Sequence, residues 1–277
     1  MVKTADYRDI IKTRFPREIA AGVFWLGDCM VWEYDGTKEH SYSSTFLVVG
    51  SERSILVDTG HIKDWLVVRN QVDGLIAKGI PAPESIFPTH TEVTHSGNTG
   101  RWLTHFPKAK ACGDLRDAQL IWPQHAERLI RCKKGDAIDL GGRKFVFVEA
   151  VIRDLVSTYW GYDTKEQVLF SSDGLSFGHF HQAEQCGKTA EEIPDLPIPE
   201  LTGLFAEYAL YWTRLKSCEL ALERLQQMME KDYPTRIVAS AHGSIITDPT
   251  KTMPLIREGM RRVSSMAVDS SVAKAKG

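Results

Sequence analysis

The segment spanning residues 88–98, Pro-Thr-His-Thr-Glu-Val-Thr-His-Ser-Gly-Asn, constrains the chain more than any other stretch. It places His90, Glu92 and His95 just after the apolar run 85–87, so that short polar side chains gather at the mouth of a strand. Neutral imidazoles with an ionised carboxylate suit iron, zinc or manganese better than calcium. The spacing therefore predicts a metal site at the end of a buried strand.

Three other apolar runs also end in a polar residue. Asp58 follows the run 55–57, Asp173 follows 168–172, and His242 follows 237–241. Ligand groups collect at such strand ends in α/β folds, because the sheet fixes them while the loops leave room for a substrate. With the first segment, these positions supply the side chains of one polar cluster.

Hydrophobic periodicity predicts elements in the order strands, helices, strands, helices. Strands are expected over 22–26, 30–34, 44–49, 54–57, 85–87, 109–111, 144–151, 156–162, 167–171 and 236–239, and helices over 62–78, 98–106, 201–232 and 253–263. The segment 114–131 is expected to form one or two short helices interrupted at Pro123. The proline-rich stretch 174–199 reads as an irregular loop. This order predicts one α/β domain over residues 1–263, built as a four-layer αββα sandwich, with a flexible tail at 264–277.

Charge and cysteine content exclude several classes of protein. A formal net charge of −2, with interspersed charges, offers no field for nucleic acid or an acidic membrane. Without a membrane-length apolar run or a signal-like start, the chain is expected to be cytoplasmic. Its 5 cysteines lack a Cys-x-x-Cys pair and are expected to be reduced and structural, not a disulfide frame or a zinc knuckle.

On these motifs the chain resembles the metallo-β-lactamase superfamily, and within it the catalytic core of the flavodiiron proteins, which are oxygen and nitric oxide reductases. The resemblance runs from residues 22–27 through 169–173 and 207–209 to 241–243. Hydrolases of the superfamily usually have His where this chain has Glu92, and the Glu gives a more oxygen-rich site that suits iron. The resemblance implies no flavodoxin domain in this chain, hence no bound flavin and a separate electron donor.

The resemblance also implies a set of metal ligands and two gaps in it. The first metal would take His90 and Glu92, the second His95 and His242, with Asp173 bridging and Asp58 orienting the ligands. An expected Asp is replaced by Thr94, and an expected His by Val151. Two alternatives remain: a di-iron site with fewer protein ligands than usual, or a single iron held by His95, Asp173 and His242.

Replacement groups are expected close to the site. Three residues are ranked as pocket residues with catalytic roles, namely His40, His179 and Tyr159. His179 forms a His-x-His pair with His181 shortly after Asp173. Glu149 and Asp154 lie with Tyr159 on the strand pair that lost its His.

Three functions remain open from the sequence. The first is a non-heme iron protein that binds and activates dioxygen, either as an oxygenase or oxidase of a small organic substrate or as a reductase fed by a partner. The second is a zinc-dependent hydrolase, in which zinc lowers the pKa of its water; Thr94 disfavours it, because the missing Asp is ligand and base in such enzymes. The third is a non-catalytic oxygen sensor. Manganese is an alternative metal, and the resemblance implies a head-to-tail homodimer.

Overall fold

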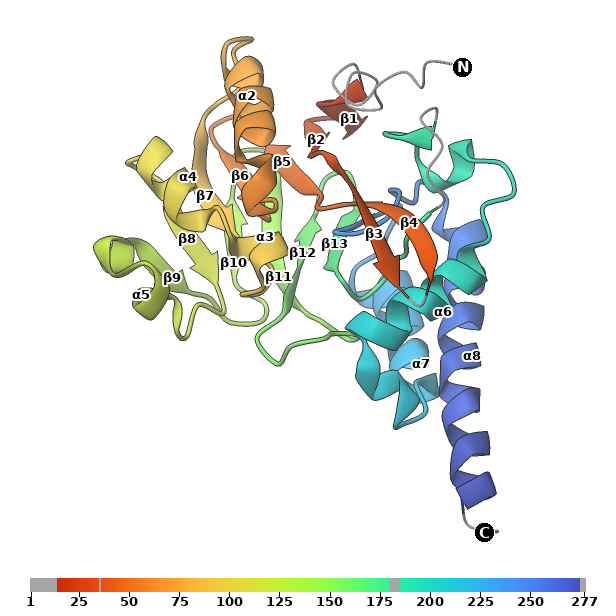
Figure 1. The fold of residues 1–277 in the computed structure, drawn as a ribbon. Helices are drawn as coiled ribbons and strands as arrows, with labels where there is room; N and C mark the ends of the chain where they lie inside the picture. The colour runs from red at the N-terminus through yellow and green to blue at the C-terminus, as the bar shows by residue number, and fades with distance from the viewer. Residues whose placement is uncertain (1–13, 35, 180–184, 275–277) are drawn as a thin grey trace.

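Two β-sheets form the centre of the computed structural model, which describes residues 14–34, 36–179 and 185–274 (Figure 1). The larger sheet has seven strands, in the order β1 (Arg17–Ala20), β2 (Val23–Leu26), β5 (Thr45–Val49), β6 (Ser54–Val57), β7 (Pro83–Phe87), β8 (Lys110–Gly113) and β9 (Leu129–Arg131). The smaller sheet has five, in the order β10 (Ala137–Asp139), β11 (Lys144–Glu149), β12 (Tyr159–Asp163), β13 (Val168–Ser172) and β14 (Ile237–Ser240).

A separate hairpin joins β3 (Cys29–Tyr34) to β4 (Thr37–Tyr42) and crosses the space beside the two sheets (Figure 1). Its register pairs Cys29 with Tyr42 and Val31 with His40. Because side chains alternate along a strand, Cys29, His40 and Tyr42 share one face of the hairpin. The part of that face formed by these three residues is buried, since each of their side chains is at most 3% exposed.

Helices cover the outer face of each sheet. The larger sheet carries α2 (Trp65–Ile76), α3 (Val93–Ser96), α4 (Thr99–His105) and α5 (Ala118–Ile121). The smaller sheet carries α6 (Ile198–Ala209), α7 (Glu219–Gln227) and α8 (Pro249–Lys274), with a π-helical turn, Met228–Asp232, closing α7. The result is the four-layer αββα sandwich that the sequence predicted.

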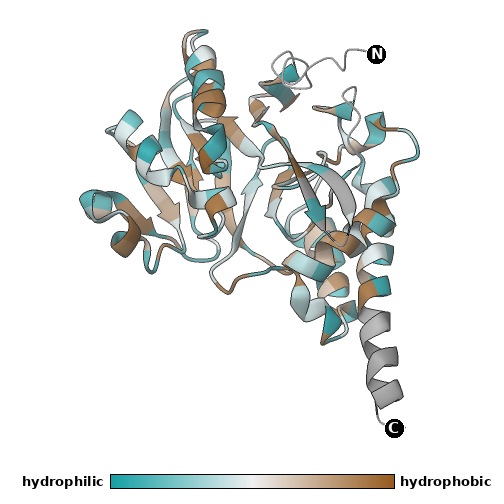
Figure 2. Ribbon diagram, viewed as in Figure 1, coloured by the Kyte–Doolittle hydropathy of each residue, from teal (hydrophilic) through white to brown (hydrophobic). Residues whose placement is uncertain are grey.

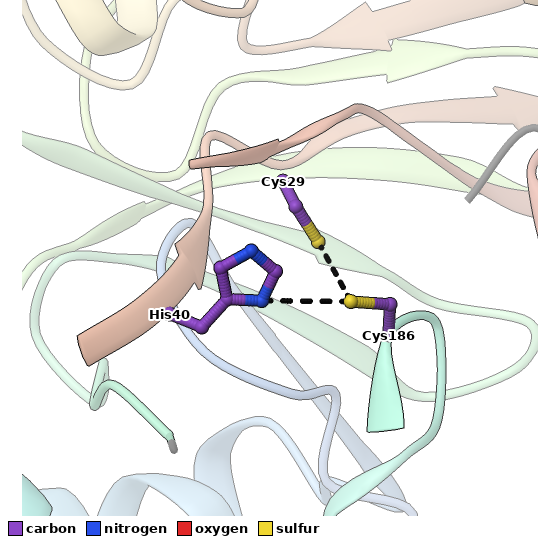
Figure 3. Close-up of side chains that lie close together, drawn as sticks. All are labelled: Cys29, His40 and Cys186. Carbon is purple, nitrogen blue, oxygen red and sulfur yellow. Dashed lines mark hydrogen bonds between the residues drawn. The ribbon is translucent and has the colours of Figure 1, made fainter. Parts of the chain in front are cut away.

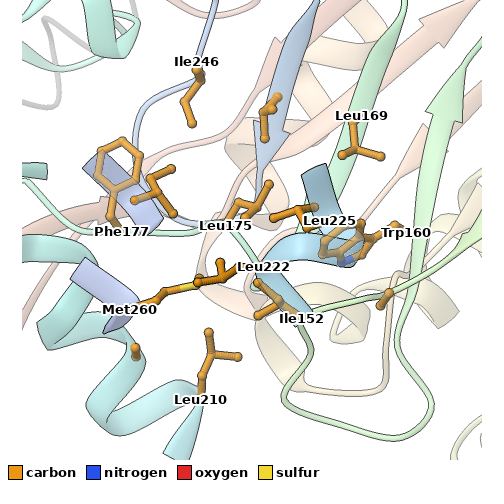
Figure 4. Packing of buried hydrophobic residues seen from close by; sticks show 14 of the residues in the cluster. Ile152, Trp160, Leu169, Leu175, Phe177, Leu210, Leu222, Leu225, Ile246 and Met260 are labelled. Atoms are coloured by element: carbon orange, nitrogen blue, oxygen red, sulfur yellow. The ribbon is translucent and has the colours of Figure 1, made fainter. Parts of the chain in front are cut away.

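Three apolar clusters hold these layers together, and alternation along the strands assigns each side chain to one of them. On β5, Phe46 and Val48 point between the sheets toward Phe145 and Phe170, whereas Leu47 points outward toward α2. The third cluster joins the outer face of the smaller sheet to α6, α7 and α8 (Figure 4). The helices show both hydrophilic and hydrophobic stretches in Figure 2, as expected of elements with one buried face.

The strands that carry polar residues at their ends run in the same direction within each sheet. β6 pairs with β7 in parallel, and β13 pairs with β14 in parallel. β11 is antiparallel to β12, which is antiparallel to β13, so β11 also ends at the same edge as β13. The carboxyl ends of these strands are where an α/β fold assembles a ligand site.

The structure departs from the predicted elements in several places, and strands β1, β4, β9 and β10 were not predicted. The segment 114–131 does contain two short helices separated near Pro123, but its last residues form β9. The helix expected over 201–232 is divided into α6, a 3-10 turn and α7. The last helix begins at Pro249 and continues past Val263 to Lys274, because the sequence after Val263 contains neither glycine nor proline before Lys274 to stop it.

Within the described ranges, no helix is both long enough and apolar enough to span a bilayer.

Candidate metal centre

Three histidines and their neighbouring carboxylates meet where the two sheets present their strand ends. His90 follows β7, His95 lies on the short helix α3, and His242 follows β14. Asp173 follows β13 and is 3% exposed, so its carboxylate lies in the interior between the three imidazoles. The structure thus brings together residues far apart in the sequence.

Each imidazole is oriented through its Nδ1 atom. His95 Nδ1 lies 2.9 Å from Asp58 Oδ2, and His90 Nδ1 lies 3.0 Å from the hydroxyl of Ser172. His242 Nδ1 donates to the backbone carbonyl of Tyr42. Because a carbonyl only accepts, His242 carries its proton on Nδ1, and its Nε2 lone pair is free to bind a cation when the ring is neutral.

The two oxygens of Asp173 face different groups of side chains. Asp173 Oδ1 lies 3.2 Å from His95 Nε2 and 3.4 Å from His242 Nε2. Asp173 Oδ2 lies 3.8 Å from His90 Nε2. A carboxylate divided in this way is placed to bridge two ions. We call His95, His242 and Asp173 the nitrogen-rich set.

The other side of Asp173 is an oxygen-rich set consisting of His90, Glu92, Asp154 and Asp173. His90 Nε2 lies 3.3 Å from Asp154 Oδ2 and 3.9 Å from Glu92 Oε2. Asp154 is on the loop between β11 and β12, and Thr158 donates a hydrogen bond to its Oδ1, which leaves Oδ2 for the site. The side chain of Glu92 is 54% exposed, so this set opens toward solvent.

Several polar atoms of the site are buried without a hydrogen-bond partner among the described residues, namely His90 Nε2, His95 Nε2, Asp154 Oδ2 and Asp173 Oδ1. Unpaired polar atoms in the interior are costly and rare. Ligand atoms around one ion with bonds of about 2.1 Å lie about 3 to 3.5 Å apart, which is close to the separations here. The donors therefore fit a pair of metal ions, because bound ions would supply the partners that these atoms lack.

Electrostatics within the site favours ionised carboxylates. Burial alone would raise the pKa of Asp173, but the charges of His95, His242 and His90 outweigh it, and the pKa lies well below its usual value. Burial lowers the pKa of His95, yet Asp173 and Asp58 together raise it well above its usual value. The nearby His90 imidazole, whose Nε2 lies 3.9 Å from Glu92 Oε2, holds the pKa of Glu92 below its usual value.

Two residues of the site have a strained backbone. Asp58 has φ 55° and Ser172 has φ 50°, both in the left-handed region that residues other than glycine seldom adopt. Asp58 accepts from the N–H of Thr89 and from His95, while Ser172 contacts both Thr89 and His90. Such strain concentrates at functional sites, where the surrounding structure enforces it.

Asp154 lies in the cluster, although the sequence favours Tyr159 over it as the replacement group. Tyr159 was favoured on the strand pair that lost its His, yet Asp154 is the one within 3.3 Å of His90. A loop has no hydrophobic periodicity, so the position of Asp154 could not be predicted from the sequence. Tyr159 donates its N–H to the carbonyl of Thr89, and Glu149 pairs instead with Lys134 and Arg224 at the surface.

Val151 and Thr94, the two substituted positions, lie close to the site without supplying the expected ligands. Val151 shares the wall of a pocket of about 360 Å³ with Asp154 and Trp212. The indole N–H of Trp212 donates to the carbonyl of Arg153 and so supports the loop that carries Asp154. The hydroxyl oxygen of Thr94 is buried and has no partner among the described residues.

His40 and His179, expected as pocket residues, contact each other and residues Tyr42 and Cys186. Their backbones form a bridge, with His40 N to His179 O at 2.6 Å. The ring of His179 stacks on Tyr42, and His40 Nδ1 lies 3.5 Å from the thiol of Cys186. His181 lies outside the described residues.

The fold and the site together define a class of protein. The four-layer αββα sandwich with a His and carboxylate cluster at its strand ends is the metallo-β-lactamase type of fold. Within that class, the chain is similar to the catalytic core of flavodiiron proteins.

The comparisons behind that similarity cover most of this chain and part of each relative. A coenzyme F420H2 oxidase of Methanothermobacter marburgensis is 28% identical over 249 residues, 85% of this chain and 59% of the relative. An anaerobic nitric oxide reductase flavorubredoxin of Vibrio vulnificus is 24% identical over 220 residues, 77% of this chain and 42% of the relative. The chain thus spans less than two thirds of the length of these curated relatives.

Solved structures give the same fold at lower identity. The flavodiiron protein from Giardia intestinalis superposes with a TM-score of 0.67 at 16% identity, covering 89% of this chain and 58% of that one. No family model matches the sequence.

Proposed function

We propose that this chain is a non-heme iron oxidoreductase that reduces dioxygen or nitric oxide at a pair of irons. One observation carries the proposal: Asp173 Oδ1 faces His95 and His242 while Oδ2 faces His90, and Nε2 of both His90 and His95 is buried without a hydrogen bond among the described residues. The similarity to an F420H2 oxidase and to a nitric oxide reductase supports this class of reaction.

The proposed ligands differ between the two irons. One ion would take the oxygen-rich set of His90, Glu92, Asp154 and Asp173, and the other the nitrogen-rich set of His95, His242 and Asp173. Asp58, Glu92, Asp154 and Asp173 carry four negative charges when ionised, which two divalent ions would neutralise. Mixed imidazole and carboxylate donors suit iron, and the three carboxylates of the oxygen-rich set favour it over softer ions.

The chain's own residues would orient and shield this centre. Ferrous ions held there would supply electrons for reducing a diatomic substrate. Asp58, Ser172 and the Tyr42 carbonyl fix the three imidazoles, so that little rearrangement is needed when the ions bind. Phe205 of α6 is 1% exposed and packs with its ring 5.7 Å from that of His242, which excludes water on that side.

Electrons for the reaction would come from a redox group outside the described fold. The described residues all belong to the αββα sandwich and its hairpin. A separate protein, or a further part of a longer chain, would therefore deliver them. Cytoplasmic location and a homodimer remain predictions from the sequence.

The experiment separates the iron protein from the zinc hydrolase. Protein purified without oxygen is analysed for metal, reduced, freed from excess reductant and mixed with dissolved dioxygen or nitric oxide, while the gas and the optical spectrum are followed. We expect about two irons per chain and consumption of at least one of the two gases. Stoichiometric zinc with ester or phosphodiester turnover would contradict the proposal.

A pair of variants provides the control for that experiment. His242→Ala removes a proposed ligand and should lower both iron content and gas consumption. His105→Ala removes a histidine of similar type that pairs with Asp73 at the surface, 32% exposed, and should leave both unchanged. If the two variants behave alike, the assignment of His242 is wrong.

A further inference from the structure

A second group of potential metal ligands lies on the buried face of the β3–β4 hairpin. Cys29 comes from β3, His40 from β4, and Cys186 from the segment that precedes α6 (Figure 3). The Cys29 and Cys186 sulfurs are 3.3 Å apart, and Cys186 Sγ lies 3.5 Å from His40 Nδ1. One ligand atom from each residue lies within 4.8 Å of the others. We call these three residues the thiol cluster.

We propose that the thiol cluster is a structural Zn²⁺ site, formed by Cys29 Sγ, Cys186 Sγ and His40 Nδ1. Around tetrahedral zinc, with bonds of about 2.3 Å to sulfur and 2.0 Å to nitrogen, two sulfurs lie about 3.8 Å apart and a sulfur and a nitrogen about 3.5 Å apart. The distance between Cys186 Sγ and His40 Nδ1 already has this value, and the sulfurs would separate by about 0.5 Å. A disulfide would require them to approach by about 1.3 Å.

Burial selects a divalent ion over a monovalent one. Cys186 and His40 are 0% exposed and Cys29 is 3% exposed, so the site lies in the low-dielectric interior. Two thiolates and Zn²⁺ form a neutral group, whereas two thiolates with Cu⁺ would leave a net negative charge buried. Zinc also stands above ferrous iron in affinity for such donors.

Tyr42 links the hairpin to the segment that carries Cys186. The phenol oxygen of Tyr42 accepts a hydrogen bond from the N–H of Gly187, 2.6 Å away, and so ties β4 to the residue after Cys186. Burial and the neighbouring Cys186 raise the pKa of the Cys29 thiol. The sequence suggested structural thiols without zinc, because Cys29 and Cys186 are too far apart in the chain to form a spacing motif.

Cobalt provides a probe that does not depend on the proposed iron site. The full chain is produced in zinc-depleted, cobalt-supplemented medium, because Co²⁺ replaces Zn²⁺ in tetrahedral sites. Sulfur-to-cobalt charge-transfer absorption in the near ultraviolet is expected from the thiol cluster only, since neither iron ligand set contains sulfur. Wild-type protein that binds cobalt without this absorption overturns the zinc site and leaves the iron proposal untouched.

Matched cysteine pairs control for nonspecific thiol binding. Cys29→Ser with Cys186→Ser should abolish the absorption and leave the iron content unchanged. Cys112→Ser with Cys132→Ser removes another interacting pair of buried thiols, and should leave the absorption intact. Absorption that survives the first pair, or disappears with the second, contradicts the assignment.

Two measurements on the wild-type chain apply even if the variants do not fold. X-ray absorption at the zinc edge should show sulfur neighbours at about 2.3 Å. Denatured protein treated with chelator should yield all 5 cysteines as free thiols. A zinc environment of nitrogen and oxygen alone, or a count two thiols short because of a disulfide, overturns the proposal.

Discussion

The two ligand sets that share Asp173 compensate differently for the substitutions in this sequence. In the proposed oxygen-rich set, Asp154 lies 3.3 Å from His90 and would replace the expected His at Val151. In the proposed nitrogen-rich set, Thr94 offers only a hydroxyl, which leaves His95, His242 and Asp173 as ligands. Asp154 lies on a loop and Thr94 on helix α3, so the proposed replacement occurs where the backbone path is not fixed by a helix.

Loss of the shared carboxylate should have the largest effect, because it belongs to both sets. Asp173→Asn is expected to reduce bound iron from two ions to almost none and to abolish gas consumption. Iron analysis after anaerobic purification measures this. Asp73→Asn, a surface substitution, is the control and should retain full iron. One iron retained in Asp173→Asn would show that Asp173 does not bridge.

The second largest effect is expected from removing a ligand of the nitrogen-rich set, because only three protein ligands would hold its iron. His242→Gln leaves two protein ligands there, and we expect the loss of one iron with the other retained. A titration of metal-free protein with Fe²⁺ should then show one site in place of two. Loss of both ions would mean that the two sets fold or bind as a single unit.

Removal of Asp154 tests the proposed replacement ligand. Asp154→Asn leaves three protein ligands in the oxygen-rich set, so its iron should bind about 100-fold more weakly without being lost at saturating metal. The same Fe²⁺ titration measures the affinity. Glu149→Gln, on the neighbouring strand but paired with Lys134 and Arg224, should bind both ions normally. Equal affinities for the two variants would remove Asp154 from the site.

The orienting role of Asp58 should produce a smaller change, confined to the nitrogen-rich set. Asn tolerates the left-handed backbone at this position. Asp58→Asn therefore removes the negative charge that faces His95 Nδ1 with little backbone strain. About a 10-fold loss in affinity for one iron is expected. The melting temperature of the metal-free protein serves as a check that the fold is intact. An equal loss of affinity for both irons would indicate a general loss of structure.

Restoring the missing carboxylate should give the smallest effect and the opposite sign. Thr94→Asp adds a fourth donor beside His95, and several-fold tighter binding of the second iron is expected. The threonine hydroxyl is buried without a partner among the described residues, so a polar side chain at this position would not replace an existing hydrogen bond. Unchanged affinity would mean that the side chain at position 94 does not reach the ion.

The sequence allowed the fold and most of the proposed centre to be predicted, for a specific physical reason. Buried strands have a clear hydrophobic pattern, and His90, Asp173 and His242 follow such strands directly, so their convergence follows from the sheet. Asp154 and the thiol cluster depend on loop paths and on hairpin packing. Those contacts are between residues distant in sequence, and no local periodicity encodes them.

Tyr42 contacts both the proposed iron site and the proposed zinc site. Its carbonyl accepts from His242 at one site, while its phenol oxygen ties the hairpin to the residue beside Cys186 at the other. Any displacement of this one residue on filling either site is felt by both. Linkage is reciprocal, so by whatever factor zinc changes the affinity for iron, iron changes the affinity for zinc. If binding at either site displaces Tyr42, zinc bound at the hairpin would change how tightly the proposed iron centre binds its ions.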